Sequence, residues 1–233
     1  MTYEPQDVVA YHGDLAGDWE GRYRKRSFRA RVEALEECLR GRDLAGTQWL
    51  DAGCGTGTLT RFLGEKGCQV TGVDAAPRMI EVAREQAQQH PRGGEMHFEI
   101  SATIERLPNA DASLDGILCS SVLEYVSNPE RCLADFARAL KSGGLLLISV
   151  PNAESAIRRA QVGFHRLGRK AGRPWLNFVQ YSRNQYSKDE FEALLRTYGF
   201  ETEKAITFGS PIPRWMQRWR RGGSLLMFLA VRS

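Results

Sequence analysis

The stretch Leu50-Asp51-Ala52-Gly53-Cys54-Gly55-Thr56-Gly57 decides the fold, because an apolar strand ends in it and a glycine-rich turn begins. A second apolar run, Val70-Thr71-Gly72-Val73, ends on Asp74. The glycines allow positive φ angles and lack the Cβ atoms that would keep a ligand away from the backbone. A glycine turn beside a carboxylate, at the ends of two adjacent parallel strands, is typical of α/β sheets that bind a nucleoside cofactor.

Strand and helix patterns alternate outward from this turn, which predicts a mainly parallel sheet. A strand over 68–74 is followed by a helix that begins at Pro77, a residue favoured in the first turn. Alternating apolar residues over 96–100 predict an edge strand, whereas the continuous apolar runs 117–119 and 145–150 predict buried strands.

The C-terminal part predicts a different pairing. A capping box at Ser187-Lys188-Asp189-Glu190 begins a helix that ends at Gly199. Two further strands, over 200–208 and 224–232, are joined by a segment too short for a helical crossover. We therefore expect these two strands to pair antiparallel.

Composition and charge set wider limits. With 233 residues and 42% apolar residues, the chain can bury one core, and we expect a single domain over 1–233. No run approaches the roughly 20 apolar residues of a membrane span, and no signal peptide is recognisable, so a cytoplasmic location is expected. The five scattered cysteines predict reduced structural thiols. The net charge of +4 does not by itself indicate nucleic-acid binding, and none is expected.

The glycine spacing discriminates between cofactors. A nicotinamide dinucleotide favours G-x-G-x-x-G, whereas this turn reads G-x-G-x-G after Asp51 and lacks the third glycine at the pyrophosphate spacing. An acid at that position favours a cationic amino group nearby. A nicotinamide-dependent oxidoreductase is thus the weaker alternative.

Further motifs follow in order: Gly72-Val73-Asp74, Leu107-Pro108, Ser113-Leu114-Asp115-Gly116-Ile117, Val122-Leu123-Glu124-Tyr125-Val126 and Leu140-Lys141-Ser142-Gly143-Gly144. Together with the glycine turn, between Trp49 and Val150, they resemble the motifs of class I S-adenosylmethionine-dependent methyltransferases, similar to the small-molecule enzymes of the ubiquinone pathway. The resemblance implies S-adenosyl-L-methionine as the cofactor and no metal.

The same resemblance implies a Rossmann-like α/β fold. Its seven-stranded sheet would be mostly parallel, with a C-terminal antiparallel hairpin and helices on both faces. Within the one domain we expect an N-terminal helical lid (1–46), a cofactor-binding core (47–150), a substrate-cover insertion (151–186), and a last helix and hairpin (187–233).

Roles for single residues follow from the resemblance. The turn from Asp51 to Gly57 would hold the methionine end of the cofactor, and Asp74 the ribose. Relatives usually carry an Asp before Leu-Pro to bind the adenine, where this chain has Thr103. The expected cofactor-binding residues are Asp51, Gly53, Cys54, Gly55, Gly57, Asp74, Ala75, Met79, Thr103, Ile104, Glu105, Cys119 and Ser120.

The catalytic residues are less defined. Where many relatives carry Glu-His after the fourth strand, this chain has Glu124-Tyr125. We expect Tyr125 and His165 as the catalytic candidates, with two further tyrosines, Tyr181 and Tyr186, as alternatives; the competing interpretation is that all four pack or line the pocket. The histidines show no metal-ligand spacing, and His12, His90 and His97 are expected to be surface or structural residues.

Two basic segments suggest partners. Arginines over 158–173 stand among the aromatic residues Phe164, Trp175, Phe178, Tyr181 and Tyr186, which favours an aromatic, lipid-like or anionic substrate. The alternative is a solvated basic helix held by core aromatic residues. The segment 211–221 interleaves tryptophan with arginine, which suits a membrane surface, an anionic partner or a solvated loop.

The N-terminal aromatic residues complete the expected site. Tyr11, Trp19, Tyr23, Phe28 and Arg31 would form the lid, with ordinary helix packing as the alternative. The predicted activity is methyl transfer to a small molecule, at oxygen of an aromatic, quinol-like or lipid-like acceptor. An N- or C-methyltransferase and a cofactor-binding module without turnover are the alternatives.

Overall fold

A computed structural model describes residues 5–19, 21, 26–170, 178–209 and 223–233. Its elements are α1 (Pro5–Leu15), η1 (Ala16–Asp18), α3 (Arg26–Leu39), β1 (Gln48–Ala52), α4 (Thr58–Glu65), β2 (Gln69–Asp74), α5 (Pro77–Gln88), η2 (Gly93–Glu95), β3 (Met96–Ile100), β4 (Leu114–Ser120), α6 (Pro129–Ala139), β5 (Leu140–Pro151), α7 (Ala156–Lys170), α8 (Phe178–Tyr181), α9 (Lys188–Thr197), β6 (Phe200–Phe208) and β7 (Leu225–Arg232).

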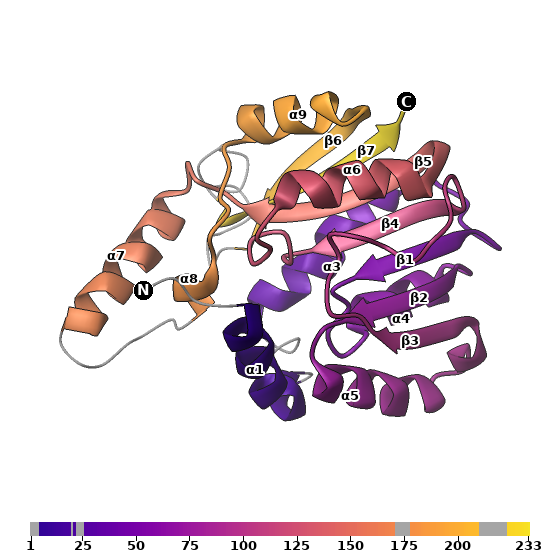
Figure 1. The fold of residues 1–233 in the computed structure, drawn as a ribbon, viewed down its shortest axis with the longest axis horizontal. Coiled ribbons are helices and arrows are strands. Elements are labelled where there is room, and N and C mark those ends of the chain that lie inside the picture. The colour runs from indigo at the N-terminus through magenta and orange to yellow at the C-terminus, as the bar shows by residue number, and fades with distance from the viewer. Residues whose placement is uncertain (1–4, 20, 22–25, 171–177, 210–222) are drawn as a thin grey trace.

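The strands form one seven-stranded sheet in the order β3-β2-β1-β4-β5-β7-β6 (Figure 1). The first five strands pair in parallel, whereas β7 is antiparallel to both β5 and β6. The predicted hairpin is therefore confirmed, and so is the position of β3 at an edge.

Helices cover both faces of the sheet, as predicted. On one face Leu35 of α3 and Leu63 of α4 pack against Trp49 of β1. On the other face Phe136 of α6 and Phe191 of α9 belong to a second apolar cluster with β4 and β5. All four of these helix residues are fully buried, which accounts for the amphipathic patterns read from the sequence.

Local signals set the ends of the C-terminal helix. The hydroxyl of Ser187 accepts a hydrogen bond from the Glu190 N–H, and the Glu190 carboxylate accepts one from the Ser187 N–H. This capping box starts α9 where the sequence predicts it. Gly199, with φ of +76°, follows the helix and turns the chain into β6.

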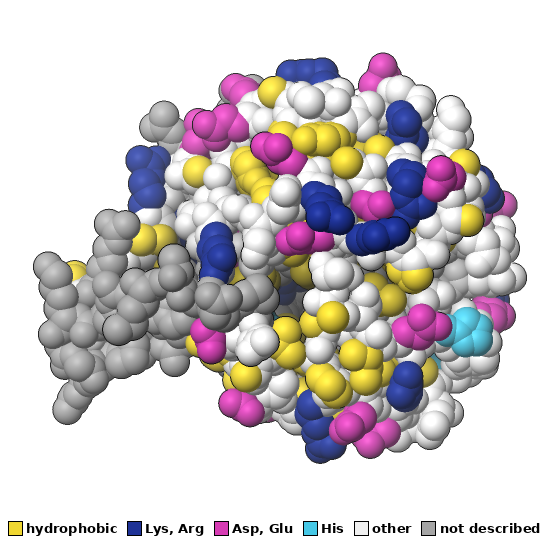
Figure 2. Space-filling model, in the orientation of Figure 1, with side chains coloured by type: hydrophobic (Ala, Val, Ile, Leu, Met, Phe, Trp, Pro, Cys, Tyr) yellow, Lys and Arg dark blue, Asp and Glu magenta, His cyan; other side chains and the backbone are white. Residues whose placement is uncertain are grey.

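Three further features concern the cysteines, the length of the helices and the surface charges. The five cysteines are free and buried. Among the described residues, none of the helices has the length and apolar character required to cross a bilayer. On the face shown in Figure 2, basic side chains lie next to acidic ones, so the charges of the two signs are interspersed there.

Candidate active site

A cavity of about 650 Å³ lies at the carboxyl ends of the parallel strands, where α1 faces the sheet (Figure 1). Its walls come from the turns after β1, β2, β3 and β4, and from α1, α3 and α7. Ligands of open α/β sheets bind at the carboxyl ends of the strands, because the chain there leaves the strands in loops. The predicted cofactor turn and Asp74 both belong to the lining.

The glycine turn has the conformation that its composition predicts. Gly53, Gly55 and Gly57 have φ angles of +83°, +55° and +74°. A Cβ atom on Gly53 would come within 2.3 Å of the Val122 side chain. On Gly55 a Cβ would lie 3.5 Å from Nε1 of Trp19, in the cavity wall. The turn is therefore a backbone cradle that a side chain at Gly55 would fill.

Asp74 connects two of the turns. Its carboxylate accepts hydrogen bonds of 2.9 Å from the N–H of Gly55 and of 2.9 Å from the N–H of Ala76. Burial raises the pKa of Asp74, and these two bonds oppose that rise. Helix α5 has Ala76 as its N-cap residue, so Asp74 organises the turn rather than capping the helix. Each carboxylate oxygen accepts more than one bond, which leaves capacity for a ligand hydroxyl.

Asp51 is almost completely buried in the cavity wall. It accepts a hydrogen bond of 2.7 Å from the Thr60 hydroxyl. Burial, opposed by the Thr60 hydrogen bond and reinforced by the nearby charge of Asp74, raises the pKa of Asp51 to about 7. A cationic amino group bound beside Asp51 would stabilise the carboxylate form, so this position suits the methionine end of the expected cofactor.

The loop after β3 forms the third wall. The Thr103 hydroxyl accepts a hydrogen bond of 3.0 Å from the N–H of Glu105. The Glu105 carboxylate in turn accepts bonds from the N–H groups of Ser127 and Asn128. These bonds shape the loop at the place where the resemblance implies contacts with the adenine.

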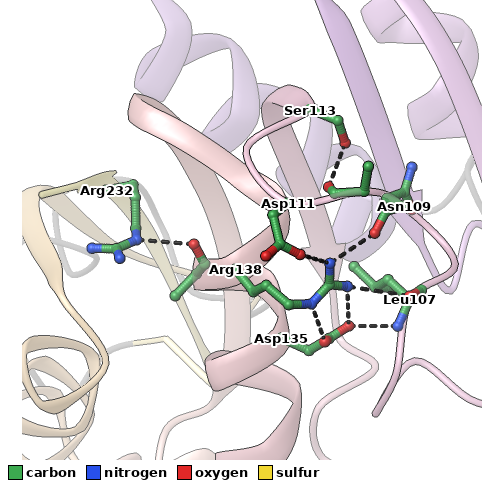
Figure 3. A network of polar contacts seen from close by, with 9 residues as sticks. Leu107, Asn109, Asp111, Ser113, Asp135, Arg138 and Arg232 are labelled. Atoms are coloured by element: carbon green, nitrogen blue, oxygen red, sulfur yellow. Dashed lines mark hydrogen bonds and ion pairs between the residues drawn. The ribbon is translucent and has the colours of Figure 1, made fainter.

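A polar network anchors the same loop farther along (Figure 3). The Arg138 guanidinium on α6 donates to the carboxylates of Asp135 and Asp111, at 2.8 and 2.7 Å. It also donates to the carbonyls of Asn109 and Leu107, at 2.8 and 3.2 Å. One side chain thus holds the Leu-Pro segment against α6.

The opposite side of the cavity is built from distant parts of the chain. Arg31 of α3 donates a hydrogen bond of 3.0 Å to the hydroxyl of Ser121, just after β4. Ser121 has a φ of +59°, a conformation that a serine rarely adopts. The hydroxyl of Ser149 in β5 accepts the Ser121 N–H at 2.9 Å and so holds this conformation.

A buried ion pair closes this side. Glu124 and Arg158 of α7 lie 3.5 Å apart, with 5% and 4% of their side chains exposed. Arg158 also donates to the Ser182 hydroxyl, and the Glu124 carbonyl accepts the Arg183 N–H at 2.8 Å. Burial raises the pKa of Glu124 although the Arg158 charge opposes it. The pair ties the segment after β5 to the motif after β4.

Tyr125 lines the cavity but is not suited to act as a base. Burial, followed by the nearby charge of Glu124, raises the pKa of Tyr125 well above its usual range. Its phenol therefore stays protonated at neutral pH. Its ring centre lies 5.1 Å from that of His12 on α1.

The structure brings most of the predicted site residues together. The predicted residues that line the cavity are Asp51, Gly53, Cys54, Gly55, Asp74, Ala75, Met79, Thr103, Ile104, Glu105, Ser120 and Tyr125. Gly57 lies outside the lining as the N-cap residue of α4, and His165 is buried on α7 outside it. Cys119 is fully buried in the core beside α6, because alternate residues of a strand point to opposite faces.

The expected aromatic wall needs correction. Phe164 is 58% exposed on α7, and Tyr186 packs against Phe191 in the core. Tyr181 contacts Tyr11 with ring centres 5.1 Å apart and ring planes tilted by 41°. The side chains of Tyr23, Phe28, Trp175 and Phe178 lie outside the described residues, as does the segment 211–221.

The lining also includes residues that the sequence had not singled out as site or lid residues: Val8, Val9, His12, Leu15, Leu59, Ala76, Ser101, Ala102, Ser121, Val122, Glu124, Val126, Ser127, Arg158, Gln161, Gly209, Ser224 and Leu225. Glu124 could have been found from the sequence, because it stands in a recognised motif of which only Tyr125 was given a role. For α1 the available signal was a group of aromatic residues before the sheet, which indicated a lid without singling out His12.

Comparisons with known proteins agree with this geometry. A family model described as "Methyltransferase domain" matches residues 50–148. The ubiquinone biosynthesis O-methyltransferase of Xylella fastidiosa is 33% identical over 181 residues, which cover 76% of this chain and 69% of that protein. The malonyl-[acyl-carrier protein] O-methyltransferase of Serratia marcescens is 38% identical over 110 residues, covering 47% of this chain and 40% of that protein.

The chain therefore spans well under half the length of the Serratia relative. Among solved structures, magnesium protoporphyrin IX methyltransferase from Synechocystis with bound SAH superposes with a TM-score of 0.72 at 20% identity, covering 99% of this chain and all of that one. That likeness shows the fold. The extent of the match to the Xylella relative shows the family: the chain belongs to the class I S-adenosylmethionine-dependent methyltransferases.

Proposed function

We propose that this protein transfers a methyl group to a small molecule, at an oxygen atom of an aromatic, quinol-like or lipid-like acceptor. The observation that carries the proposal is the composition of the cavity beyond the cofactor turns. Tyr11, Leu15 and Trp19 from the N-terminal region and Tyr125 after β4 provide apolar and aromatic walls, and Arg31 adds a cation. The names of the two O-methyltransferases above support the choice of oxygen.

The turns after β1, β2 and β3 would bind the cofactor. Asp51 would hold the amino group, the Gly53–Gly57 turn would hold the methionine backbone, and Asp74 would accept hydrogen bonds from the ribose hydroxyls. The loop around Thr103 would border the adenine. S-adenosyl-L-methionine, when bound, supplies a methyl group that is already activated by its sulfonium charge.

The chain's own contribution is then positioning. The cavity of about 650 Å³ lies within the usual range for small-molecule sites. Holding the acceptor oxygen in line with the reacting carbon lowers the entropic part of the barrier, and the apolar walls exclude water.

Two segments that cover the cavity would have different roles. We assign the lid to the N-terminal region 1–46, of which α1 and Trp19 line the cavity while α3 covers one face of the sheet. We assign the acceptor cover to 151–186, of which Arg158 and Gln161 reach the lining.

The test is a transfer assay with S-adenosyl-L-methionine labelled with ¹³C in its methyl group. Catechols, quinols, fatty acids and amines would be offered in parallel, and the ¹³C shift of each product distinguishes O-, N- and C-methylation. We expect O-methylated catechol or quinol products. N- or C-methyl products alone would contradict the choice of oxygen, and adenosylhomocysteine binding without any transfer would favour a binding module.

A further inference from the structure

His12, on the cavity-facing side of α1, has no role in the function proposed so far. Its ring nitrogen Nδ1 lies 2.9 Å from the carbonyl oxygen of Val8, one helical turn earlier. A carbonyl can only accept a hydrogen bond, so Nδ1 carries the proton. In the neutral ring the lone pair that can take up a proton is then on Nε2.

Aromatic groups fix the position of the His12 ring. The rings of Tyr125 and Trp19 lie edge-on to it, at 5.1 and 5.8 Å between centres, and Tyr11 flanks it on α1 at 5.2 Å. The contact with Tyr125 places His12 beside the motif that follows β4. A histidine from the lid thus stands next to the Glu124-Tyr125 motif of the core.

Among the described residues, charged and titratable groups near His12 come from the end of β2, from the segment after β4 and from α1 itself. Asp74, at the end of β2, lies close enough for the charge of His12 to lower its pKa. Tyr125, from the segment after β4, and Tyr11, from α1 itself, are protonatable neighbours through their rings. The charges of Glu124 and Arg31 act in turn on Tyr125: Glu124 raises the pKa of Tyr125 and Arg31 lowers it.

The carboxylates of the cavity lining already have structural partners. Asp51 accepts the Thr60 hydroxyl, and Asp74 accepts two backbone N–H groups. Glu105 accepts the N–H groups of Ser127 and Asn128.

Glu124, the remaining carboxylate among the described lining residues, is paired with Arg158. Histidine is the side chain whose unperturbed pKa, about 6.5, lies nearest to neutral pH. A phenol held against the apolar walls would find its best matched proton acceptor in His12.

We propose that His12 is the catalytic residue that accepts the proton of the acceptor hydroxyl, an inference that rests on the function proposed above. Bound S-adenosyl-L-methionine would supply the methyl group: the acceptor oxygen would bond to the methyl carbon while the carbon–sulfur bond breaks and leaves its electron pair on sulfur. The hydroxyl proton passes to Nε2 of His12, which becomes an imidazolium and later releases that proton to solvent. The proposed base is therefore carried by α1, outside the sheet that holds the cofactor turns.

The probe for this role is 4-nitrocatechol, because its phenolate form absorbs visible light. The full-length protein, saturated with adenosylhomocysteine, would be titrated with the probe from pH 5 to pH 9. We expect the bound probe to ionise about one pH unit lower with the wild-type protein than with His12→Gln, a tenfold difference in ionisation equilibrium. His97→Gln, an exposed histidine on β3, is the matched control and should behave like the wild type.

The outcomes separate the two proposals. If the probe binds and ionises identically in wild type and His12→Gln, His12 is not the proton acceptor, and the proposed acceptor site stands. If adenosylhomocysteine binds but the probe does not, the proposed aromatic acceptor site fails, and the assignment of His12 fails with it. Calorimetry with adenosylhomocysteine, together with His12→Asn as a second variant, shows that the altered proteins remain folded and able to bind the cofactor product.

Discussion

The two sides of the cavity differ in how the chain builds them. The cofactor side consists of short turns that directly follow β1, β2 and β3, so each of its residues lies within a few positions of a strand end. The acceptor side joins α1, α3, α7 and the segment after β4, through contacts such as that between Arg31 and Ser121. The first side is thus specified locally and the second by tertiary contacts, so we expect substitutions to affect them differently.

The largest effect is expected from Arg158→Met on the acceptor side. Removing one partner of a buried ion pair leaves the other charge uncompensated and costs about 3 to 5 kcal/mol in the free energy of unfolding. Urea denaturation measures this loss. Arg159→Met, at the next and exposed position of α7, is the matched control and should change little.

The same variant tests whether the two sides are independent. Adenosylhomocysteine affinity of Arg158→Met, measured below the unfolding transition, should stay within about threefold of wild type, a difference under 1 kcal/mol. A much weaker affinity would show that the ion pair also shapes the cofactor side, and the contrast drawn above would be lost.

Asp74→Ala should give the converse result. Loss of a charge-assisted pair with the ribose is expected to weaken adenosylhomocysteine binding tenfold or more, about 1.4 kcal/mol, by calorimetry. Asp115→Ala is the control, because that carboxylate accepts a hydrogen bond from the N–H of Gln48 at the amino ends of β1 and β4, away from the cavity. Unchanged affinity in Asp74→Ala would remove Asp74 from the site.

The smallest effect concerns the loop that Arg138 anchors on the cofactor side. Burial tends to raise the pKa of Asp135, but the hydrogen bonds from Arg138 and Leu107 and the Arg138 charge lower it overall. The folded state therefore binds this proton less readily than the unfolded state. The resulting stability is present above the unfolded pKa of about 3.9 and is lost as the pH falls through the lower folded value.

Arg138→Gln should therefore destabilise the protein by about 1 kcal/mol at pH 7, and the difference from wild type should shrink toward pH 3. Urea denaturation at several pH values measures this, with the exposed Arg131→Gln on the same helix as control. A difference that is constant from pH 7 to pH 3 would mean that the Asp135 carboxylate does not contribute.

Much of the fold could be predicted from the sequence, because its signals are local. The alternation in 96–100 placed β3 at the edge, and the short connection before 224 predicted the antiparallel hairpin. The course of 151–186 was less predictable. Its polar helix α7 buries Arg158 while leaving Phe164 exposed, and polarity along the sequence does not tell which of the two faces the protein.

The residues of the candidate site also differ in how far the sequence alone could predict them. Glycine turns and strand-end carboxylates can be recognised from sequence because the backbone itself requires them, as the φ angles of Gly53 and Gly55 show. Cys119 was expected at the site because it stands at the end of the fourth strand, yet the pleat of the strand turns it into the core. His12 was expected to be an ordinary surface or structural histidine, since nothing near it in the sequence shows that Tyr125 lies beside it.

The position of β7 between β5 and β6 has a consequence for biosynthesis. As a nascent chain leaves the ribosome, residues 200–208 emerge before the only described strand with which they pair. Until 225–232 follow, the backbone groups along the outer edge of β5 also lack their final neighbour. Translation must therefore pass β7 before the hydrogen bonds that join β5, β7 and β6 can form, so this part of the sheet is completed after the parallel part.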